Sequence, residues 1–189
     1  MRYGEGFVVE RGGTLVNDRR SPYAYPSTRG FEYADGDRGD MLVEDFTCIY
    51  QKPGTTETYR ITVVGNAHPL IRENSFDFDF ASIDFRALRA LSCDKADYRI
   101  RTASLLHDIL FCVHDPAFPL HDTNVLLREV IEAYSGSIDS NGYQSHSVTD
   151  AILREKVYAS VVLFGKRYWD KTDDELLTYR RLFKIERIK

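Results

Sequence analysis

Histidine and aspartate stand next to each other three times in one short stretch. The pairs are His107-Asp108, His114-Asp115 and His121-Asp122. Each pair follows the previous one after seven residues, which is close to two turns of an α-helix. A helix would therefore place the first two histidines on nearly the same face. Imidazole and carboxylate groups bind metals and act as general acids and bases, so the repeat predicts a candidate site.

Each of these residues also has a structural interpretation. His107 lies near an apolar helical stripe, where a buried imidazole is satisfied by a carboxylate or a backbone group. Asp108 would need a partner if it were buried. His114 suits a helix C-terminus and Asp122 suits a helix N-cap. The spacing also differs from that of a zinc-binding helix, in which two histidines lie four residues apart.

A second group of candidates comes earlier in the chain. Residues 76–80 alternate Phe and Asp, which predicts a strand with its Phe side chains inward and Asp77 and Asp79 on the open face. These carboxylates either keep the strand soluble, or one of them lines a site. Ser82 and Cys112 are possible nucleophiles, but neither lies in a known nucleophile motif. The sequence has no phosphate-binding glycine loop.

Strands are expected before the candidate site and helices around it. Alternating apolar residues over 41–51 and 58–64, with a Pro-Gly turn between them, predict a β-hairpin. Apolar residues at helical spacing predict helices over about 98–114 and 123–134. We interpret 135–144 as a polar loop.

Two capping boxes predict the last helices. Ser147 and Asp150 precede the longest helix. Its apolar stripe is Leu153, Val157, Val161, Phe164 and Tyr168. Thr172 and Glu175 precede a short C-terminal helix. Its apolar residues are Leu176, Tyr179 and Phe183. The order of elements predicts an α+β fold, in which an N-terminal antiparallel hairpin or small sheet packs against three to four C-terminal helices.

The chain divides into three parts on this interpretation. Residues 1–40 form an N-terminal arm or loop rich in Gly, Pro and Tyr, residues 41–169 form the α+β core, and residues 170–189 form the C-terminal helix. A long segment of this composition is usually disordered or functional. We hypothesise that the arm becomes ordered only against a partner.

Composition narrows the classes of function. The net charge is −4 and no long basic run is present, so we expect no nucleic-acid partner. Three cysteines, Cys48, Cys93 and Cys112, are odd in number and widely spaced, which predicts reduced and mostly buried thiols. The N-terminus lacks the apolar core of a signal peptide, and no apolar run reaches the length of a membrane span. We therefore expect an intracellular protein without a membrane segment.

Two short motifs together suggest a family. Asp79-Phe80-Ala81-Ser82-Ile83 is followed twenty residues later by Ala103 and then by Leu106-His107-Asp108-Ile109-Leu110. This combination resembles the phage and prophage family catalogued as domain of unknown function 1353. The resemblance covers roughly 41–169, although Asp84 stands where the family usually has proline.

The resemblance implies both a source and a site. It implies a bacteriophage or prophage gene, with Asp122 as the next motif aspartate and Gly165 and Trp169 as a closing pair. It also implies a cluster in space, formed by Asp79, Ser82, His107, Asp108 and Asp122. Such a cluster is either a catalytic site or a polar network that joins a strand to two helices.

Two functions are compatible with these patterns. The first is a structural (virion) or protein-interaction component that binds other phage or host proteins, is oligomeric, and is located in the host cytoplasm or in the virion. The alternative is a metal-assisted hydrolase, in which a divalent metal activates water. Its metal ligands would be His107, Asp108 and Asp122, with Asp79 as a further ligand or acid–base group. We favour the first function, because no complete set of nucleophile, base and orienting residue can be named.

Overall fold

A four-stranded antiparallel sheet forms the base of the fold. The computed structural model describes residues 6–15, 24–32, 38–65, 77–78, 98–141, 143–169 and 179–189. Within them, β1 (Phe7–Arg11), β6 (Phe46–Gln51), β7 (Thr58–Val63) and β11 (Phe183–Arg187) pair in the order β1-β6-β7-β11. The predicted α+β class is confirmed.

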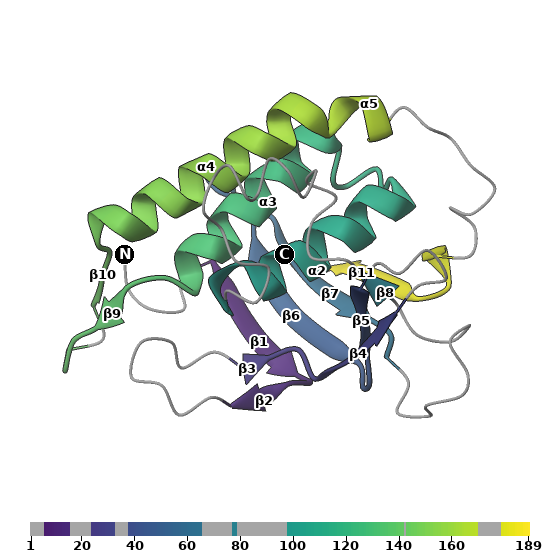
Figure 1. Cartoon of the computed structure of the whole chain (residues 1–189), viewed down its shortest axis with the longest axis horizontal. Helices are drawn as coiled ribbons and strands as arrows, with labels where there is room; N and C mark the ends of the chain where they lie inside the picture. The colour runs from purple at the N-terminus through teal and green to yellow at the C-terminus, as the bar shows by residue number, and fades with distance from the viewer. Residues whose placement is uncertain are drawn as a thin grey trace.

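Helices cover one side of this sheet (Figure 1). The first two, α2 (Tyr98–Val113) and α3 (Leu120–Ala133), form the inner layer, and α4 (Val148–Phe164) packs on α3 as an outer layer. The short α5 (Lys166–Trp169) follows α4. No helix among the described residues is long and apolar enough to cross a membrane.

The central hairpin follows the predicted alternation. In β7 the side chains of Tyr59, Ile61 and Val63 are buried, while those between them are partly exposed. In the register, Cys48 lies opposite Ile61, and Tyr50 lies opposite Tyr59. One face of the hairpin therefore meets the helices, because successive side chains of a strand point to opposite faces. The predicted β-hairpin is confirmed.

Smaller sheets surround the central one. A three-stranded antiparallel sheet contains β4 (Thr28–Glu32), β5 (Arg38–Leu42) and β8 (Asp77–Phe78). Two further pairs are β2 (Thr14–Leu15) with β3 (Ala24–Tyr25), and β9 (Ser137–Ile138) with β10 (Gln144–Ser145). The segment 135–144, which we interpreted as a polar loop, thus contributes to a hairpin.

The prediction of a separate N-terminal arm over 1–40 is wrong for its described residues. β1 pairs with β6 inside the central sheet, and Phe7 is buried in the core. Tyr25 is buried as well and lies near Tyr134, the C-cap residue of α3. These aromatic side chains find their partners in the core of the same chain, so this part of the segment needs no outside partner to be covered.

The predicted C-terminal helix over 170–189 is also wrong at its end. Residues Phe183–Arg187 form β11, which pairs with β7 along its whole length. Phe183 fits both periods, because it lies at helical spacing from Leu176 and Tyr179 and at strand spacing from Ile185. The free edge of β7 decides between them by offering a row of backbone hydrogen bonds. The predicted capping box at Thr172 and Glu175 lies outside the described residues.

The helices themselves were predicted well. α4 begins after Ser147 with the predicted capping box, in which the Ser147 side chain and Asp150 bond each other's backbone N–H groups. Its predicted inner stripe is confirmed at Leu153, Val157 and Val161, which are buried. α3 begins at Leu120, with Pro119 in the N-cap position. Asp122 therefore lies in the first turn of α3 and is not its N-cap.

The two described cysteines differ in their burial. Cys48 is fully buried, and burial raises the pKa of its thiol above its ordinary value. Cys112 is half-buried. Cys93 lies outside the described residues.

Candidate functional site

His107 forms a buried polar cluster with one predicted and one unexpected partner. Its Nδ1 lies 3.3 Å from Oδ1 of Asp108, and its Nε2 lies 3.1 Å from Oδ1 of Asn124. The exposed fractions of His107, Asp108 and Asn124 are 2%, 6% and 4%. Since His107 and Asp108 lie on α2 and Asn124 lies on α3, the cluster links these two helices in the interior.

The partners determine how His107 carries its protons. An ionised carboxylate only accepts hydrogen bonds, so such a group at Asp108 pairs with the tautomer of His107 that carries the Nδ1 proton. There are two arrangements at Nε2. If Nε2 carries a proton, it donates to Oδ1 of Asn124; if it does not, the Asn124 side chain is flipped by 180° and its amide NH2 group donates to Nε2. Either arrangement satisfies both ring nitrogens. Both ring nitrogens of His107 thus have partners within the chain, which fits the structural interpretation of His107.

Asp122 points away from this cluster. It lies two residues before Asn124 on α3, and two residues correspond to about 200° around a helix. Its Oδ2 accepts a hydrogen bond from Lys52 Nζ at 2.7 Å, and the same ammonium donates to the carbonyl oxygen of Ala117. Lys52 Nζ also lies 4.8 Å from the centre of the Phe118 ring. Asp122 thus holds the β6–β7 turn against the α2–α3 connection.

The other two His-Asp pairs do not join the cluster either. His114 directly follows α2 and has a φ of +47°, and its ring stacks on Trp169 at 4.0 Å between ring centres. His121 is exposed. The seven-residue repeat therefore places its three histidines in three different environments, because the turn after α2 breaks the helical register that the repeat would need.

The predicted metal site is not assembled by the described residues. In this part of the chain, no group of three His, Cys, Asp or Glu residues could hold a metal ion. The proposed trio fails at Asp122, which binds Lys52 instead. Asp79 and Ser82 lie outside the described residues, so their place relative to His107 is not described.

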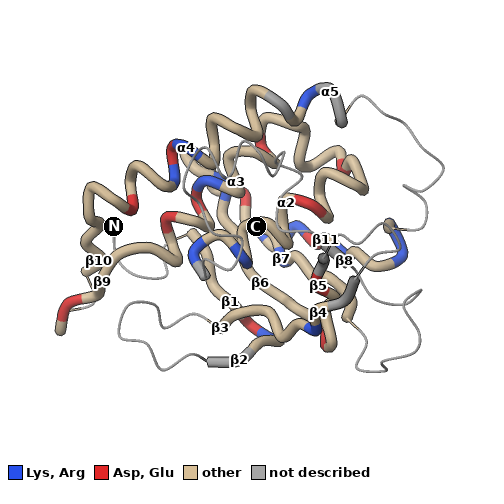
Figure 2. The backbone as a smooth tube through the Cα atoms, viewed as in Figure 1, with Lys and Arg blue, Asp and Glu red and all other residues tan. Residues whose placement is uncertain are grey.

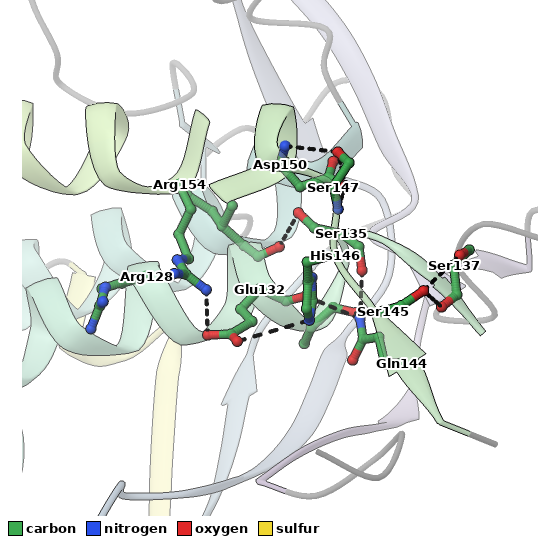
Figure 3. A network of polar contacts seen from close by, with 12 residues as sticks. Arg128, Glu132, Ser135, Ser137, Gln144, Ser145, His146, Ser147, Asp150 and Arg154 are labelled. Carbon is green, nitrogen blue, oxygen red and sulfur yellow. Dashed lines mark hydrogen bonds and ion pairs between the residues drawn. The ribbon is translucent and has the colours of Figure 1, made fainter. Parts of the chain in front are cut away.

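A second polar network lies at the surface, where the β9–β10 hairpin meets α3 and α4 (Figure 3). Glu132 of α3 binds Arg154 of α4 at 2.7 Å, and its other carboxylate oxygen lies 3.8 Å from Nε2 of His146. The side-chain amide of Gln144 donates to the carbonyl oxygens of Glu132, Ala133 and Ser135. This amide satisfies carbonyl groups that the end of α3 leaves without helical partners. Sequence reasoning did not find this network.

An open groove runs beside this network. It is lined by Arg99, Gly136, Ser137, Ser145, His146, Ser147, Thr149 and Asp150. Arg99 Nη1 lies 2.7 Å from Oδ1 of Asp150. Burial opposes ionisation of Asp150, but hydrogen bonds from Ser147 and Arg99 outweigh it and hold the pKa of this carboxyl below its ordinary value. The charged groups of the groove thus neutralise each other and fix the start of α4.

The pKa of Glu129 is shifted in the opposite direction to that of Asp150. It lines a small pocket between α3 and the sheet, together with Phe7, Tyr50, Gln51 and Glu132. Burial, and then the neighbouring Glu132 charge, raise its pKa above its ordinary value. Burial likewise raises the pKa of Tyr50. A single carboxyl in a small pocket does not make a catalytic set.

The outer face of α4 exposes large apolar side chains before and after the exposed charged residues Glu155 and Lys156. Val148, Ile152, Val162 and Leu163 are 77%, 49%, 46% and 73% exposed. From Val157 to Gly165 the helix has no charged residue, and its tube in Figure 2 is free of red and blue there. Because Leu153, Val157 and Val161 are buried on the inner side, α4 has apolar residues on both sides. The sequence already contained this signal, because these apolar residues fall on a different face of the predicted helix from the stripe of Leu153, Val157 and Val161.

Comparisons of the chain with protein-family models, with curated proteins and with solved structures found no match.

Proposed function

We propose that this chain functions by binding protein, as a structural or interaction component, and that the outer face of α4 is its binding surface. The observation that carries the proposal is the exposure of Val148, Ile152, Val162 and Leu163 on one helix. Contiguous exposed apolar patches commonly mark interaction sites in proteins, because leaving such area in water is unfavourable.

The inner side of α4 supports this proposal. Ion pairs and the capping box at Asp150, Arg154 and Glu132 anchor the helix to the rest of the fold. The inner apolar stripe is buried in the core. The outer residues are therefore not needed to hold α4 in place, and their apolar character calls for another explanation.

The proposed source and partners come from the motif resemblance. On that basis the partners are other phage or host proteins, in the host cytoplasm or in a particle. The metal-assisted hydrolase is the weaker proposal, because His107 and Asp108 are buried and Asp122 is bound to Lys52. A thermal-stability titration with Zn²⁺, Mn²⁺ and Mg²⁺ tests it, since a bound metal raises the unfolding temperature. We expect no rise for the wild type or for His107→Ala.

The binding surface is tested with the proteins encoded beside this chain in its genome. The wild type, Leu163→Asp and Ile188→Asp are each co-expressed with those proteins and purified by a tag. Ile188 is a matched control, because it is 42% exposed and lies outside α4. We expect a neighbouring protein to co-purify with the wild type and with Ile188→Asp, and to be lost with Leu163→Asp. Equal recovery with all three variants would show that α4 is not the binding surface.

A further inference from the structure

We propose that the open edge of β11 binds β11 of a second copy of this chain, so that the two strands pair antiparallel across a twofold axis and the two central sheets become one. The inference goes beyond the proposed function, since it concerns a different surface and does not depend on α4. β11 is the last strand in the order β1-β6-β7-β11, and among the described residues no strand pairs with its other side. Figure 1 shows β11 and β1 at opposite sides of the central sheet.

The two edges of the central sheet differ in regularity. The pairing of β1 with β6 has a register shift between Val9 and Arg11, whereas β11 pairs with β7 along its whole length without a shift. Irregular edges discourage further pairing, because a bulge displaces the hydrogen-bonding groups and twists the strand. The regular β11 is therefore the edge that is better suited to receive another strand.

The backbone of β11 has hydrogen-bonding groups directed to the open side. The carbonyl oxygen of Leu182 accepts from Val64 N–H, and Ile188 N–H donates to the carbonyl oxygen of Thr58. Residues of an antiparallel strand alternate between facing the partner strand and facing away from it, so the even-numbered residues face β7. The odd-numbered residues direct their N–H and C=O groups to the open side, and they are Phe183, Ile185 and Arg187. No backbone hydrogen bond within the described part of the chain uses these groups.

A twofold axis at Ile185 joins these groups to each other. A twofold contact requires that residue i of one copy meets residue j of the other, and that j meets i. With the axis perpendicular to the sheet, Ile185 lies opposite Ile185 of the second copy, and Phe183 lies opposite Arg187. Each residue in these pairs has its backbone groups on the open side, so the pairs can form hydrogen bonds in both directions.

The charges on the outer face of β11 select this register. Lys184 and Glu186 are exposed, and they alternate with Phe183 and Ile185, which lie on the side of the helices. With the axis at Ile185, Lys184 lies opposite Glu186 of the second copy, and Glu186 lies opposite Lys184. Moving the axis by one residue would place two lysines or two glutamates opposite each other. Opposite charges stabilise a cross-strand pair and like charges destabilise it, so the strand is complementary to itself in one register.

The dimer would also extend a row of charges that already crosses the sheet. Arg60 Nε lies 2.9 Å from Glu10 Oε2, and Arg60 Nη1 lies 3.0 Å from Glu186 Oε2. The signs alternate from Glu10 to Arg60 to Glu186, and Lys184 of the second copy would be the next member. Lys184 has no ion pair among the residues that the structure describes. This need for an opposite charge is our reason for choosing a second copy over an unrelated strand.

The inner face of β11 is compatible with the same pairing. Ile185 is half-buried, and its counterpart in the second copy would cover more of it. Arg187 would lie opposite Phe183, and its charge is already balanced by Glu57, whose Oε1 lies 2.9 Å from Nη2. The pairing ends with β11, because residues 179–182 before it form a turn. One pair of strands is a small interface, so we expect weak and reversible association.

Charge variants test the register by analytical ultracentrifugation of the full chain. Lys184→Glu and Glu186→Lys should each raise the Kd of the dimer at least about tenfold, because each places like charges opposite each other twice. An equimolar mixture of the two variants should associate more tightly than either variant alone, since a carboxylate then meets an ammonium group at both positions. Lys156→Glu is the matched control, because Lys156 is exposed on α4. It should leave the Kd unchanged.

A proline variant tests the backbone hydrogen bonds. Proline has no N–H group, but an edge strand tolerates it where that N–H faces away from the neighbouring strand. Ile185→Pro should therefore leave the pairing of β11 with β7 intact and raise the Kd at least about tenfold above that of Ile185→Ala, which keeps the N–H. Thermal unfolding at low protein concentration shows whether each variant is folded. If Ile185→Pro does not fold, the charge variants decide the question.

Several outcomes would overturn the proposal. A wild type that stays monomeric up to about 1 mM would do so, since a Kd above this value corresponds to very weak binding. A dimer unaffected by Lys184→Glu, or a mixture that associates no better than its separate variants, would do so as well. Leu163→Asp should leave this dimer intact while it removes binding of a neighbouring protein. The two proposals can therefore fail independently.

Discussion

α3 is held on two sides by polar networks that differ in their contact with water. On the side of α2, Asn124 meets His107 in the interior, where all members are almost fully buried. On the side of α4, Glu132 meets Arg154 at the surface, where both side chains are partly exposed. Water can replace a lost partner in the second network but not in the first. The same kinds of side chain should therefore contribute very different amounts to stability.

The largest effect is expected from breaking the buried network. His107→Ala removes the partner of two buried polar groups and leaves a cavity, so we expect the free energy of unfolding to fall by about 3 kcal/mol. Urea unfolding measures this change. The matched control is His121→Ala, which removes an exposed histidine and should change stability by less than about 0.5 kcal/mol. Similar values for both variants would contradict the structural role of His107.

A smaller effect is expected from the surface network. Arg154→Ala breaks the ion pair with Glu132 and one of the pairs of Glu155, and we expect a loss of about 1 kcal/mol. Because exposed ion pairs are screened, the loss should shrink when the salt concentration is raised. Urea unfolding at low and high salt gives both values. A loss as large as that of His107→Ala would remove the contrast between the two networks.

The pH dependence of stability separates two carboxyl groups, Asp150 and Glu129, whose pKa values are shifted in opposite directions. The lowered pKa of Asp150 means that its contribution is fully present above its unfolded pKa and is lost as the pH falls through its folded pKa. Glu129 has a raised pKa, so the native state holds its proton more tightly and stability decreases as the pH rises through that folded pKa. Asp150→Asn should flatten the acid loss, and Glu129→Gln should flatten the opposite slope. Thermal unfolding of the wild type and both variants is measured from about pH 3 to about pH 8, because this range spans the usual pKa values of carboxyl groups.

The smallest effect on stability is expected on the outer face of α4. Leu163→Asp should change the free energy of unfolding of the monomer by less than about 0.5 kcal/mol, because the side chain is mostly exposed. Urea unfolding measures it. A loss of more than about 2 kcal/mol would mean that Leu163 packs in the fold, as a core residue does.

Local patterns were sufficient for much of the fold. The β6–β7 hairpin and α2 follow from alternation and helical spacing, and α4 follows from its capping box and inner stripe. The contact of His107 with Asp108 joins neighbours in sequence. Each of these features depends on residues within a few positions of one another, so the sequence carries the signal directly.

Features that depend on distant partners were missed or misplaced. β11 was predicted as helix because Phe183 lies at helical spacing from Leu176 and Tyr179, and only the pairing of β11 with β7 shows that Phe183 begins a strand. The N-terminal segment was predicted as an arm, although β1 completes the sheet beside β6. Asp122 was assigned to the His-Asp site, but its partner is Lys52, seventy positions earlier in the chain.

The sequence by itself thus determined the class of fold, its main hairpin and helices, and the candidate role of His107. Local spacing sets these features, because hydrogen bonds within a helix or a tight hairpin link residues that are near in the chain. Only the tertiary structure decided that Asn124 contacts His107, that Asp122 lies elsewhere, and that the outer side of α4 carries exposed apolar side chains. Which face of a helix is buried depends on what packs against it, and periodicity alone does not contain that information.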